Sequence, residues 1–391
     1  MYVFFVQLDL DIDHIAPIAY KLAKTNPNKV LIVSTNILWD IKNDYRLRHL
    51  KDVLKIEVKY IHQIQRGLFP LIRMMRVLLC LPKWILLRVP DRVWSDFYSK
   101  VTGRIIDETW AASFLQSVKA RAIVFDEGQP QGNLSVLSNA ALSLGIPRVV
   151  VPTANNVLKS LRPKSPDYSK SDYTILPHRL TLPPDERDPR LKVLGCMRYC
   201  DEWEKLNSSL VREAFPGQDL PHEPGKLKVL VFGRHTKNFS ENHSTVQRVC
   251  ALDFITTIYK RKPRTTAPRK LYEVGYNNYP SSRLIQWADV VICSISSIVL
   301  DVLYYNKIFI YPKYIAPDET ATFEDYNACW KVESEEELLA ALETIHGNRN
   351  FRPYTADDVN SFYRDAVCNG DRANDILGAY ADLIQPLCPS R

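Results

Sequence analysis

Glycine is scarce in this sequence. The 391 residues include 13 glycines against 25 prolines, and neither G-x-G-x-x-G nor G-x-x-x-x-G-K-[ST] occurs. These two patterns provide the close backbone approach that binds a dinucleotide or the phosphates of ATP and GTP. Glycine-rich cofactor loops of the dinucleotide or P-loop kind are therefore not expected.

Zinc-type cysteine spacing and long apolar runs are also missing. The eight cysteines include no C-x-x-C pair, and several lie within apolar runs, as reduced core cysteines do, so a reducing cytoplasm is expected. No apolar run reaches the roughly 18–20 residues that a membrane-spanning helix needs. The apolar start, 1–6, lacks a preceding basic region and runs into Asp9, which predicts a strand rather than a signal peptide.

Length, composition and charge describe a globular protein with more than one domain. At roughly 150 residues per domain, 391 residues suggest two or three domains, and 46% hydrophobic with 24% charged residues are ordinary values for a soluble chain. Residues 1–200 contain 29 Lys and Arg against 18 Asp and Glu, whereas 201–391 contain 22 against 26. The basic first half is therefore expected to face an anionic partner.

Apolar runs of strand length alternate with helical stretches along both halves of the chain. Strands are expected at YVFFVQL, KVLIVST, KIEVKYI, RAIVFDEG, PRVVVPT and KLKVLVFG, near 271–274, and twice within 283–314. Helices are expected around 15–25, after KVLIVST, through SVLSNAALSLG, and around 202–214, 245–259, 334–345 and 372–386. This β-α-β rhythm predicts parallel sheets covered by helices on both faces.

The fold class predicted from this rhythm is α/β, with two Rossmann-like domains that face a cleft. The expected divisions are an N-terminal domain (1–195), a linker (196–225), a C-terminal domain (226–370) and a final helical segment (371–391). In such a pair the carboxyl ends of both sheets converge on the cleft, where ligands bind.

Segment 66–92 interrupts the rhythm. Six basic residues are interleaved with Leu, Ile, Met, Val and Trp84, and only Asp91 opposes them. The pattern is typical of an amphipathic element that lies on an anionic membrane surface. It is equally typical of two helices that bury their apolar faces in the first domain and expose their arginines.

Ionisable residues follow the first expected strand. Asp9, Asp11, Asp13 and His14 stand between that strand and the next helix, in a loop that points into the ligand crevice of a parallel sheet. His14 is placed there for proton transfer near neutral pH, and Asp13 with its neighbours would orient the imidazole. In the alternative interpretation, His14 only caps the helix and the aspartates are solvated.

Basic residues gather in the otherwise acidic second half. The segment 260–270 carries six positive charges in eleven residues, and Arg234 and His235 end another expected strand. Because arginine can bind phosphate through two hydrogen bonds, Lys262 and Arg264 are expected to bind an anion such as a nucleotide. The alternative is a solvated basic loop. Nucleic-acid binding is not expected, because aromatic interleaving and repeated modules are missing.

The most specific pattern in the chain is 287–301. A buried strand there ends in Ser294, Ser296 and Ser297, which open a helix. Hydroxyls and backbone amides at such a turn form a phosphate site, and Asp301 would accept hydrogen bonds from a ribose. Serines that only cap the helix would show the same spacing.

This second half resembles the donor-nucleotide half of two-domain GT-B glycosyltransferases, in particular the CDP-glycerol glycerophosphotransferase-like group and the transferases of bacterial surface polysaccharides that use CMP-linked acidic sugars. The residues that carry the resemblance are 287–301, 305–312, 323–326, Ala328, Trp330 and the acidic helix that follows. The resemblance implies that Ser296 and Ser297 bind donor phosphate and that Asp301 binds ribose. The segment Lys262–Arg264 resembles the basic K-x-R/H-P segment of that group, without its frequent histidine. A final helix that crosses back to the N-domain is implied for 371–391.

The resemblance also implies a catalytic group. The stretch D-H-x-x-P at Asp13–Pro17 is similar to the H-x-x-P turn of inverting GT-B enzymes, whose histidine is the general base, so His14 inherits that role by analogy. Asp126 and Glu127, which end the strand RAIVFDEG, are a rival site. If transfer retains configuration, one of them would be the carboxylate nucleophile.

The function expected from these features is a metal-independent glycosyltransferase of bacterial surface-polysaccharide synthesis. Its donor would be a nucleotide-activated sugar, CMP- or UDP-linked, which is a substrate and not a cofactor, and its acceptor a glycan or lipid-linked glycan. The expected location is the cytoplasm, with peripheral contact to the inner face of the membrane through 66–92. The alternatives are a CDP-glycerol-type polyol-phosphate transferase, a non-catalytic nucleotide- or glycan-binding protein, and a UDP-sugar 2-epimerase.

Overall fold

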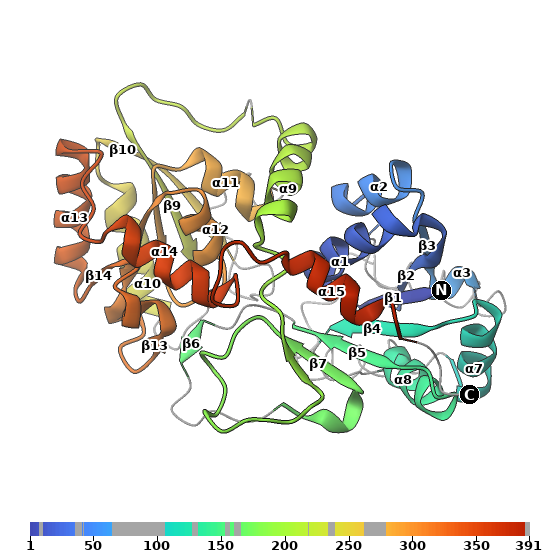
Figure 1. Ribbon diagram of the computed structural model, residues 1–391. Coiled ribbons are helices and arrows are strands. Elements are labelled where there is room, and N and C mark those ends of the chain that lie inside the picture. The colour runs from blue at the N-terminus through green and yellow to red at the C-terminus, as the bar shows by residue number, and fades with distance from the viewer. Residues whose placement is uncertain are drawn as a thin grey trace, which may run out of the picture.

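The computed structural model describes residues 1–7, 11–35, 41, 43–64, 106–126, 132–152, 157–159, 166–217, 219–233, 239–261 and 279–387. Their strands form two parallel sheets, one in each half of the chain, and helices pack against both (Figure 1). The predicted α/β architecture of two Rossmann-like domains is confirmed. The expected element at 66–92 and the expected strand near 271–274 lie outside the described residues.

The first sheet has seven strands in the order β3-β2-β1-β4-β5-β7-β8, all parallel. They are β1 (Tyr2–Val6), β2 (Val30–Ser34), β3 (Glu57–Tyr60), β4 (Ala122–Asp126), β5 (Arg148–Val151), β7 (Tyr173–Leu176) and β8 (Leu191–Val193). The central strands β1, β2, β4 and β5 are buried along their whole length, which is why they appear in the sequence as unbroken apolar runs. The last two strands on one side of the sheet, β7 and β8, were not predicted.

Helices cover both faces of this sheet. They are α1 (Ile12–Thr25), α2 (Tyr45–Asp52), α3 (Ile61–Ile64), α7 (Glu108–Ser117) and α8 (Asn133–Ser143). Successive side chains of β1 alternate between the faces, so that Phe4 packs in the cluster that contains α1, and Phe5 packs in the cluster that contains α7 and α8.

The second sheet has five parallel strands in the order β10-β9-β11-β12-β14. They are β9 (Leu227–Gly233), β10 (Ile255–Arg261), β11 (Val290–Cys293), β12 (Ile308–Pro312) and β14 (Trp330–Val332). Its helices are α10 (Phe239–Cys250), α11 (Ser281–Trp287), α12 (Val299–Tyr304), α13 (Glu335–Gly347) and α14 (Ala356–Ala366). Buried residues of α10 and α13 pack on one face, and those of α11 and α12 on the other.

The helix predicted over 245–259 is wrong in its second half. The helix α10 ends at Cys250, and Ile255–Arg261 forms strand β10, which pairs with β9 along its whole length. The segment ITTIYKR is rich in β-branched residues, which favour a strand once a neighbouring strand is available. Burial lowers the pKa of Lys260 at the end of this strand to about 8, and its ammonium donates to the Tyr279 carbonyl. This member of the basic segment is therefore turned inward.

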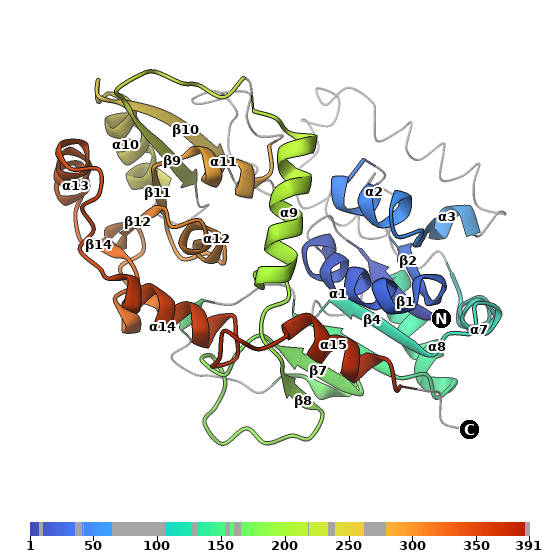
Figure 2. The ribbon, with the colours of Figure 1, turned by 45° about the horizontal axis from the view of Figure 1, so that its top comes forward.

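The chain passes between the two domains twice. The first passage leads from β8 to helix α9 (Asp201–Ala214), which packs against α2 and α11 and stands between the domains in Figure 2. The second leads from α14 to helix α15 (Ile376–Ile384), which packs against α1 (Figure 2). The passages touch at Gly195, where φ is +93° and a Cβ would lie 2.7 Å from the Val367 carbonyl. Glycine is required here for two reasons. Residues with a side chain rarely adopt a positive φ, and there is no space for a Cβ.

A short antiparallel pair forms a third contact between the domains. Strand β6 (Leu158–Lys159) extends from the first domain and pairs with β13 (Thr320–Ala321) of the second. Beside it Thr322 N donates to the Val157 carbonyl at 2.8 Å, and Lys159 Nζ lies 2.8 Å from an oxygen of Asp325.

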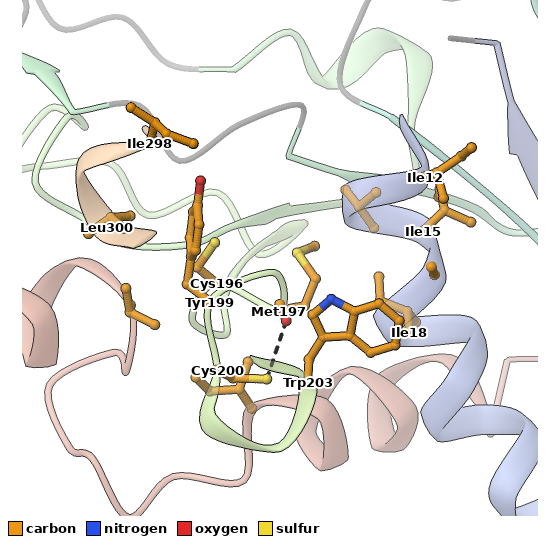
Figure 3. Close-up of a cluster of buried hydrophobic side chains, with 14 of the residues drawn as sticks. Ile12, Ile15, Ile18, Cys196, Met197, Tyr199, Cys200, Trp203, Ile298 and Leu300 are labelled. Atoms are coloured by element: carbon orange, nitrogen blue, oxygen red, sulfur yellow. Dashed lines mark hydrogen bonds between the residues drawn. The ribbon is translucent and has the colours of Figure 1, made fainter. Parts of the chain in front are cut away.

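One apolar core runs through the junction of the two domains. Figure 3 shows Ile12, Ile15 and Ile18 of α1 on one side and Ile298 and Leu300 around the start of α12 on the other, with the residues of the first passage between them. The passage contributes Cys196, Met197, Tyr199, Cys200 and Trp203, which are buried in the same cluster. The relative position of the two sheets is therefore set by packing as well as by connectivity.

Candidate functional site at the domain junction

The first sheet reverses its strand order between β1 and β4. The chain proceeds from β1 to β2 on one side of β1, while β4 pairs on the other side. Ligands of open α/β sheets bind outside the carboxyl ends of the strands at such a reversal. Asp13 and His14 lie in the first turn of α1, which follows β1, and not in the loop expected from the sequence. Asp126 is the last residue of β4, so the structure brings these three predicted residues to one reversal point. Glu127 lies outside the described residues.

The second sheet reverses its order between β9 and β11. The predicted Ser294, Ser296 and Ser297 follow β11, and Gly233 is the last residue of β9. A Cβ at Gly233 would overlap the phenol of Tyr259, so glycine lets the β10 side chain cross the end of β9. The other predicted phosphate ligands lie outside the described residues: Arg234, His235, Lys262 and Arg264.

The start of α1 is buried and held by charge. Asp11 Oδ2 accepts a 2.7 Å hydrogen bond from Gln7 N, and the side chain of His14 is 1% exposed. The Asp13 carboxylate pairs with two arginines, Arg46 of α2 and Arg198 of the first passage. The first turn of α1, with His14 in it, is therefore tied to two other elements.

Helix α2 presents Arg46 through its own N-terminal cap. Asp44 accepts hydrogen bonds from the backbone N–H groups of Arg46 and Leu47, which would otherwise be unsatisfied at the helix start. The same carboxylate takes the Arg46 guanidinium at 2.7 Å and 3.1 Å. One aspartate thus caps the helix and orients the arginine that reaches Asp13.

We call Asp13, His14 and Asp126 the first half-site, and the serine turn with Asp301 the second half-site. Arg198 joins the two. Its Nη1 lies 2.7 Å from Asp13 Oδ2, and its Nη2 lies 3.7 Å from Asp301 Oδ2. The guanidinium also lies over the ring of Tyr199, 5.0 Å from its centre. Asp13 belongs to the first domain and Asp301 to the second, so a single side chain contacts predicted residues of both.

A second buried carboxyl group interacts with Asp301 through its charge. Glu204 of α9 is 1% exposed, and its Oε2 accepts a 3.0 Å hydrogen bond from the Tyr305 hydroxyl, which also pairs with Ser208 at 2.6 Å. Burial, followed by the charge of Asp301, raises the pKa of Glu204 to about 8. Burial raises the pKa of Asp301 to about 6, while Arg198 acts in the opposite direction. Near neutral pH this pair of acids therefore holds a proton that isolated carboxylates would release.

The serine turn differs from this charged cluster. Ser294 is buried, whereas Ser296 and Ser297 are half-buried, and Ser296 Oγ accepts a long 3.4 Å hydrogen bond from Ile298 N. Tyr199 points its hydroxyl toward this turn, at the start of α12 (Figure 3). The hydroxyls of Ser296 and Ser297 are therefore partly exposed near the domain junction, close to Tyr199.

Four residues of this cluster were not among the site residues predicted from the sequence: Arg46, Arg198, Glu204 and Tyr305. Helix α9 was predicted over 202–214 and is confirmed, but its buried stripe contains Glu204, Asn207 and Ser208 beside Trp203. Three polar residues at i, i+3 and i+4 lie on the buried face. The apolar residues of α9 mark one face of the helix in the sequence, but they do not show that polar residues beside them are buried as well.

In the part of the chain that the structure describes, no helix is long and apolar enough to cross a membrane. No group of three or more His, Cys, Asp or Glu side chains among these residues has a geometry suited to a metal ion.

Solved structures match this fold over nearly the whole chain. UDP-GlcNAc 2-epimerase from Neisseria meningitidis, bound to UDP-GlcNAc, is 12% identical, with a TM-score of 0.53 over 99% of both chains. The glycotransferase of kitacinnamycin is 13% identical, with a TM-score of 0.53 over 99% of both chains. The wall teichoic acid polymerase TagF, in a structure with CDPG, is 12% identical, with a TM-score of 0.52 over 98% of this chain and 88% of that one.

The class that the architecture defines is the GT-B fold of two Rossmann-like domains, which these structures share. The sequence matches no protein-family model and no curated protein. At 12–13% identity the likeness establishes the fold.

Proposed function

We propose that the protein is a glycosyltransferase that moves a sugar from a nucleotide-activated donor, CMP- or UDP-linked, to a glycan or lipid-linked acceptor in bacterial surface-polysaccharide synthesis. The observation that carries the proposal is the position of the two half-sites. Acid–base residues lie at the strand reversal of one sheet and serine hydroxyls at that of the other, and Arg198 contacts Asp13 of the first half-site and Asp301, on the helix that the serine turn opens, of the second. The GT-B likeness to one enzyme bound to UDP-GlcNAc and to another in a structure with CDPG supports a nucleotide-linked substrate.

The donor is assigned to the second domain. Ser296 and Ser297 bind its phosphate with the basic residues Arg234, His235, Lys262 and Arg264, so the proposed reaction requires neither a metal ion nor a resident cofactor. Asp301 is 2% exposed and faces Arg198. A direct contact between Asp301 and ribose therefore requires that ion pair to open, and the half-exposed serine turn carries the donor assignment without it.

Transfer with inversion assigns the base to His14. Because this side chain is 1% exposed, its contact with the acceptor hydroxyl requires the first turn of α1 to open. The acceptor oxygen forms a bond to the anomeric carbon while the bond from that carbon to the donor phosphate oxygen breaks. The hydroxyl proton passes to the imidazole, and the nucleotide leaves as CMP or UDP, which keeps the oxygen that had linked it to the sugar. If configuration is retained, Asp126 or Glu127 is the nucleophile and a glycosyl-enzyme intermediate forms between the two displacements.

Thermal unfolding with a nucleotide panel tests the donor site. The panel contains CMP, CDP, UDP, UDP-sugars, GDP and ADP, and a ligand at one hundred times its dissociation constant stabilises the fold by about 2.7 kcal/mol. We expect stabilisation by nucleotides of one base, lost in Ser296→Ala and Ser297→Ala and kept in Ser209→Ala, an exposed serine of α9. No stabilisation by any nucleotide would make the serine turn a helix cap and remove the main support for a transferase.

Product analysis separates the alternatives. A glycosyltransferase releases nucleotide from its donor, slowly to water and faster with an acceptor, and His14→Ala abolishes the release. Release of CMP from CDP-glycerol with transfer of phosphorus to the product would indicate a polyol-phosphate transferase. Conversion of UDP-GlcNAc to its 2-epimer without acceptor would indicate an epimerase, and binding without turnover would indicate a binding protein. Addition of EDTA tests the expected independence from metal.

A further inference from the structure

Three elements from both domains meet on one guanidinium. Arg198 lies on the first passage, Asp13 in the first turn of α1 and Asp301 in α12. Two different nitrogens of Arg198 face the two carboxylates, at 2.7 Å and 3.7 Å. Asp13 precedes His14 in the chain, and Asp301 follows the serine turn by four residues, so the contact links the two half-sites.

The backbone that carries Arg198 is fixed from behind. Cys196 N donates to the Val367 carbonyl at 2.8 Å, and the Tyr380 hydroxyl donates to the Gly195 carbonyl at 3.0 Å. The Tyr363 hydroxyl donates to the Tyr199 carbonyl. Because Tyr363 belongs to α14 and Tyr380 to α15, the second passage holds the first, and the position of Arg198 follows from both.

Asp13 has a second cationic partner, because Arg46 of α2 also pairs with it. Asp301 instead interacts through its charge with a buried acid, Glu204 of α9, which accepts a hydrogen bond from Tyr305. The side chain of Arg198 is 20% exposed, that of Asp13 is 16% exposed and that of Asp301 is 2% exposed. The interaction energy of charges that are removed from water to this degree depends strongly on their geometry, because little solvent remains to replace a lost partner.

We propose that Arg198 is a positioning residue that sets the separation of the two half-sites, holding the His14 end of α1 against the helix that the serine turn opens. The role rests on the proposed function, because its purpose is to align donor and base. Arginine suits the role because its donors are held in a fixed plane. A planar guanidinium can bridge two carboxylates through separate nitrogens, whereas an ammonium presents a single nitrogen.

The test compares Arg198→Lys with a matched control. Arg148 is 6% exposed, against 20% for Arg198, and lies 3.2 Å from Asp172, but that pair lies within the first domain. Both substitutions keep the charge and loosen an ion pair, so both variants lose stability. Only Arg198→Lys loses a bridge between the domains.

The first readout is the release of nucleotide from a donor, with UDP-GlcNAc and a CMP-linked acidic sugar as the probes. We expect Arg198→Lys to lower kcat about 10- to 100-fold, the size of effect known for reacting groups misplaced by about 1 Å, with KM for the donor within about twofold. Arg148→Lys keeps kcat within about twofold. If kcat of Arg198→Lys also stays within twofold, or falls only in proportion to the unfolded fraction as in the control, the positioning role is overturned.

The second readout does not depend on catalysis. Small-angle X-ray scattering compares the radius of gyration of Arg198→Gln with those of wild type and Arg148→Gln. We expect a larger radius for Arg198→Gln, because Asp13 and Asp301 lose their common partner. Equal radii would overturn the bridge whatever the activity. A larger radius in a protein whose wild type binds and turns over neither donor would leave the bridge in place and refute the proposed function.

Discussion

Around Arg198 the two domains meet through buried charges, whereas at the β6–β13 pair they meet through two short strands and an exposed ion pair. In the first region Asp301 is 2% exposed and Glu204 1% exposed. In the second region the side chains of Lys159 and Asp325 are 47% and 51% exposed. Solvent screens a pair of the second kind and replaces it cheaply when it breaks, while a buried charge has no such substitute.

The difference teaches where the geometry of the junction is decided. Both regions connect the same two domains. The buried region contains Gly195, where there is no space for a side chain, and two acids whose pKa values are raised by burial, Glu204 and Asp301. The exposed region adds a contact without fixing its geometry. Substitutions in the two regions should therefore differ in the size of their effect and in their response to pH and salt.

The largest effect is expected from Gly195→Ala. Its φ of +93° is strained for alanine, and the new Cβ would lie 2.7 Å from the Val367 carbonyl, so the two passages would have to separate. We expect the free energy of unfolding to fall by about 2–4 kcal/mol, the combined cost of backbone strain and overpacking. Urea unfolding measures the loss.

The control for this prediction is Gly225→Ala. Gly225 has a similar φ of +84°, but a Cβ there would meet nothing within 4 Å. Only the strain remains, so we expect a loss of about 1–2 kcal/mol. Equal losses in the two variants would show that backbone conformation, and not the contact between the passages, makes Gly195 necessary.

An intermediate effect is expected from pH, through Glu204. Burial raises the pKa of this carboxyl from its ordinary 4.5 to about 8 in the folded protein. Between these values the folded chain keeps a proton that the unfolded chain releases, so stability falls as pH rises from about 4.5 to about 8. From pH 6 to pH 8 we expect a loss of about 1–2 kcal/mol, below the limit of about 1.4 kcal/mol per pH unit for one proton.

Glu204→Gln tests this assignment, because the amide cannot lose a proton. Urea unfolding at pH 6, 7 and 8 should show a flatter dependence in Glu204→Gln than in wild type. Glu213→Gln, an exposed position on the same helix, should keep the wild-type slope. A wild-type slope in Glu204→Gln would assign the titration to another group.

The smallest effect is expected at the exposed contact. Lys159→Ala removes the pair with Asp325, and a surface ion pair contributes about 0.2–1 kcal/mol. In about 1 M salt, where the screening length falls to about 3 Å, the difference from wild type should shrink. A loss as large as that of Gly195→Ala, or one that salt does not change, would contradict the contrast between the two regions.

Much of the fold was predictable because it depends on local pattern. The buried parallel strands appear as continuous apolar runs, and α9 and α13 are marked by helical spacing and acidic first turns. The wrong helix over 251–259 and the missed strands β7 and β8 have one cause. Short segments such as Ile255–Arg261 become strands only when a neighbouring strand such as β9 supplies its hydrogen bonds, and that neighbour is distant in the sequence.

The candidate site divides in the same way. Asp13, His14 and the serine turn were found because they follow strands, and the ends of parallel strands meet ligands in this class of fold. Arg46, Glu204 and Tyr305 carried no such mark. They matter because folding brings them to the same place as Arg198 and removes them from water.

The sequence by itself determined an α/β chain of two Rossmann-like halves and the strand ends at which the candidate site residues lie, because strand and helix periodicity are local properties of the chain. The tertiary structure alone decided that Arg198 faces both Asp13 and Asp301, that Glu204 is buried and interacts with the charge of Asp301, and that Lys260 points inward. These contacts join residues from distant segments, and their strength depends on burial, which is a property of the packed protein and of no single segment.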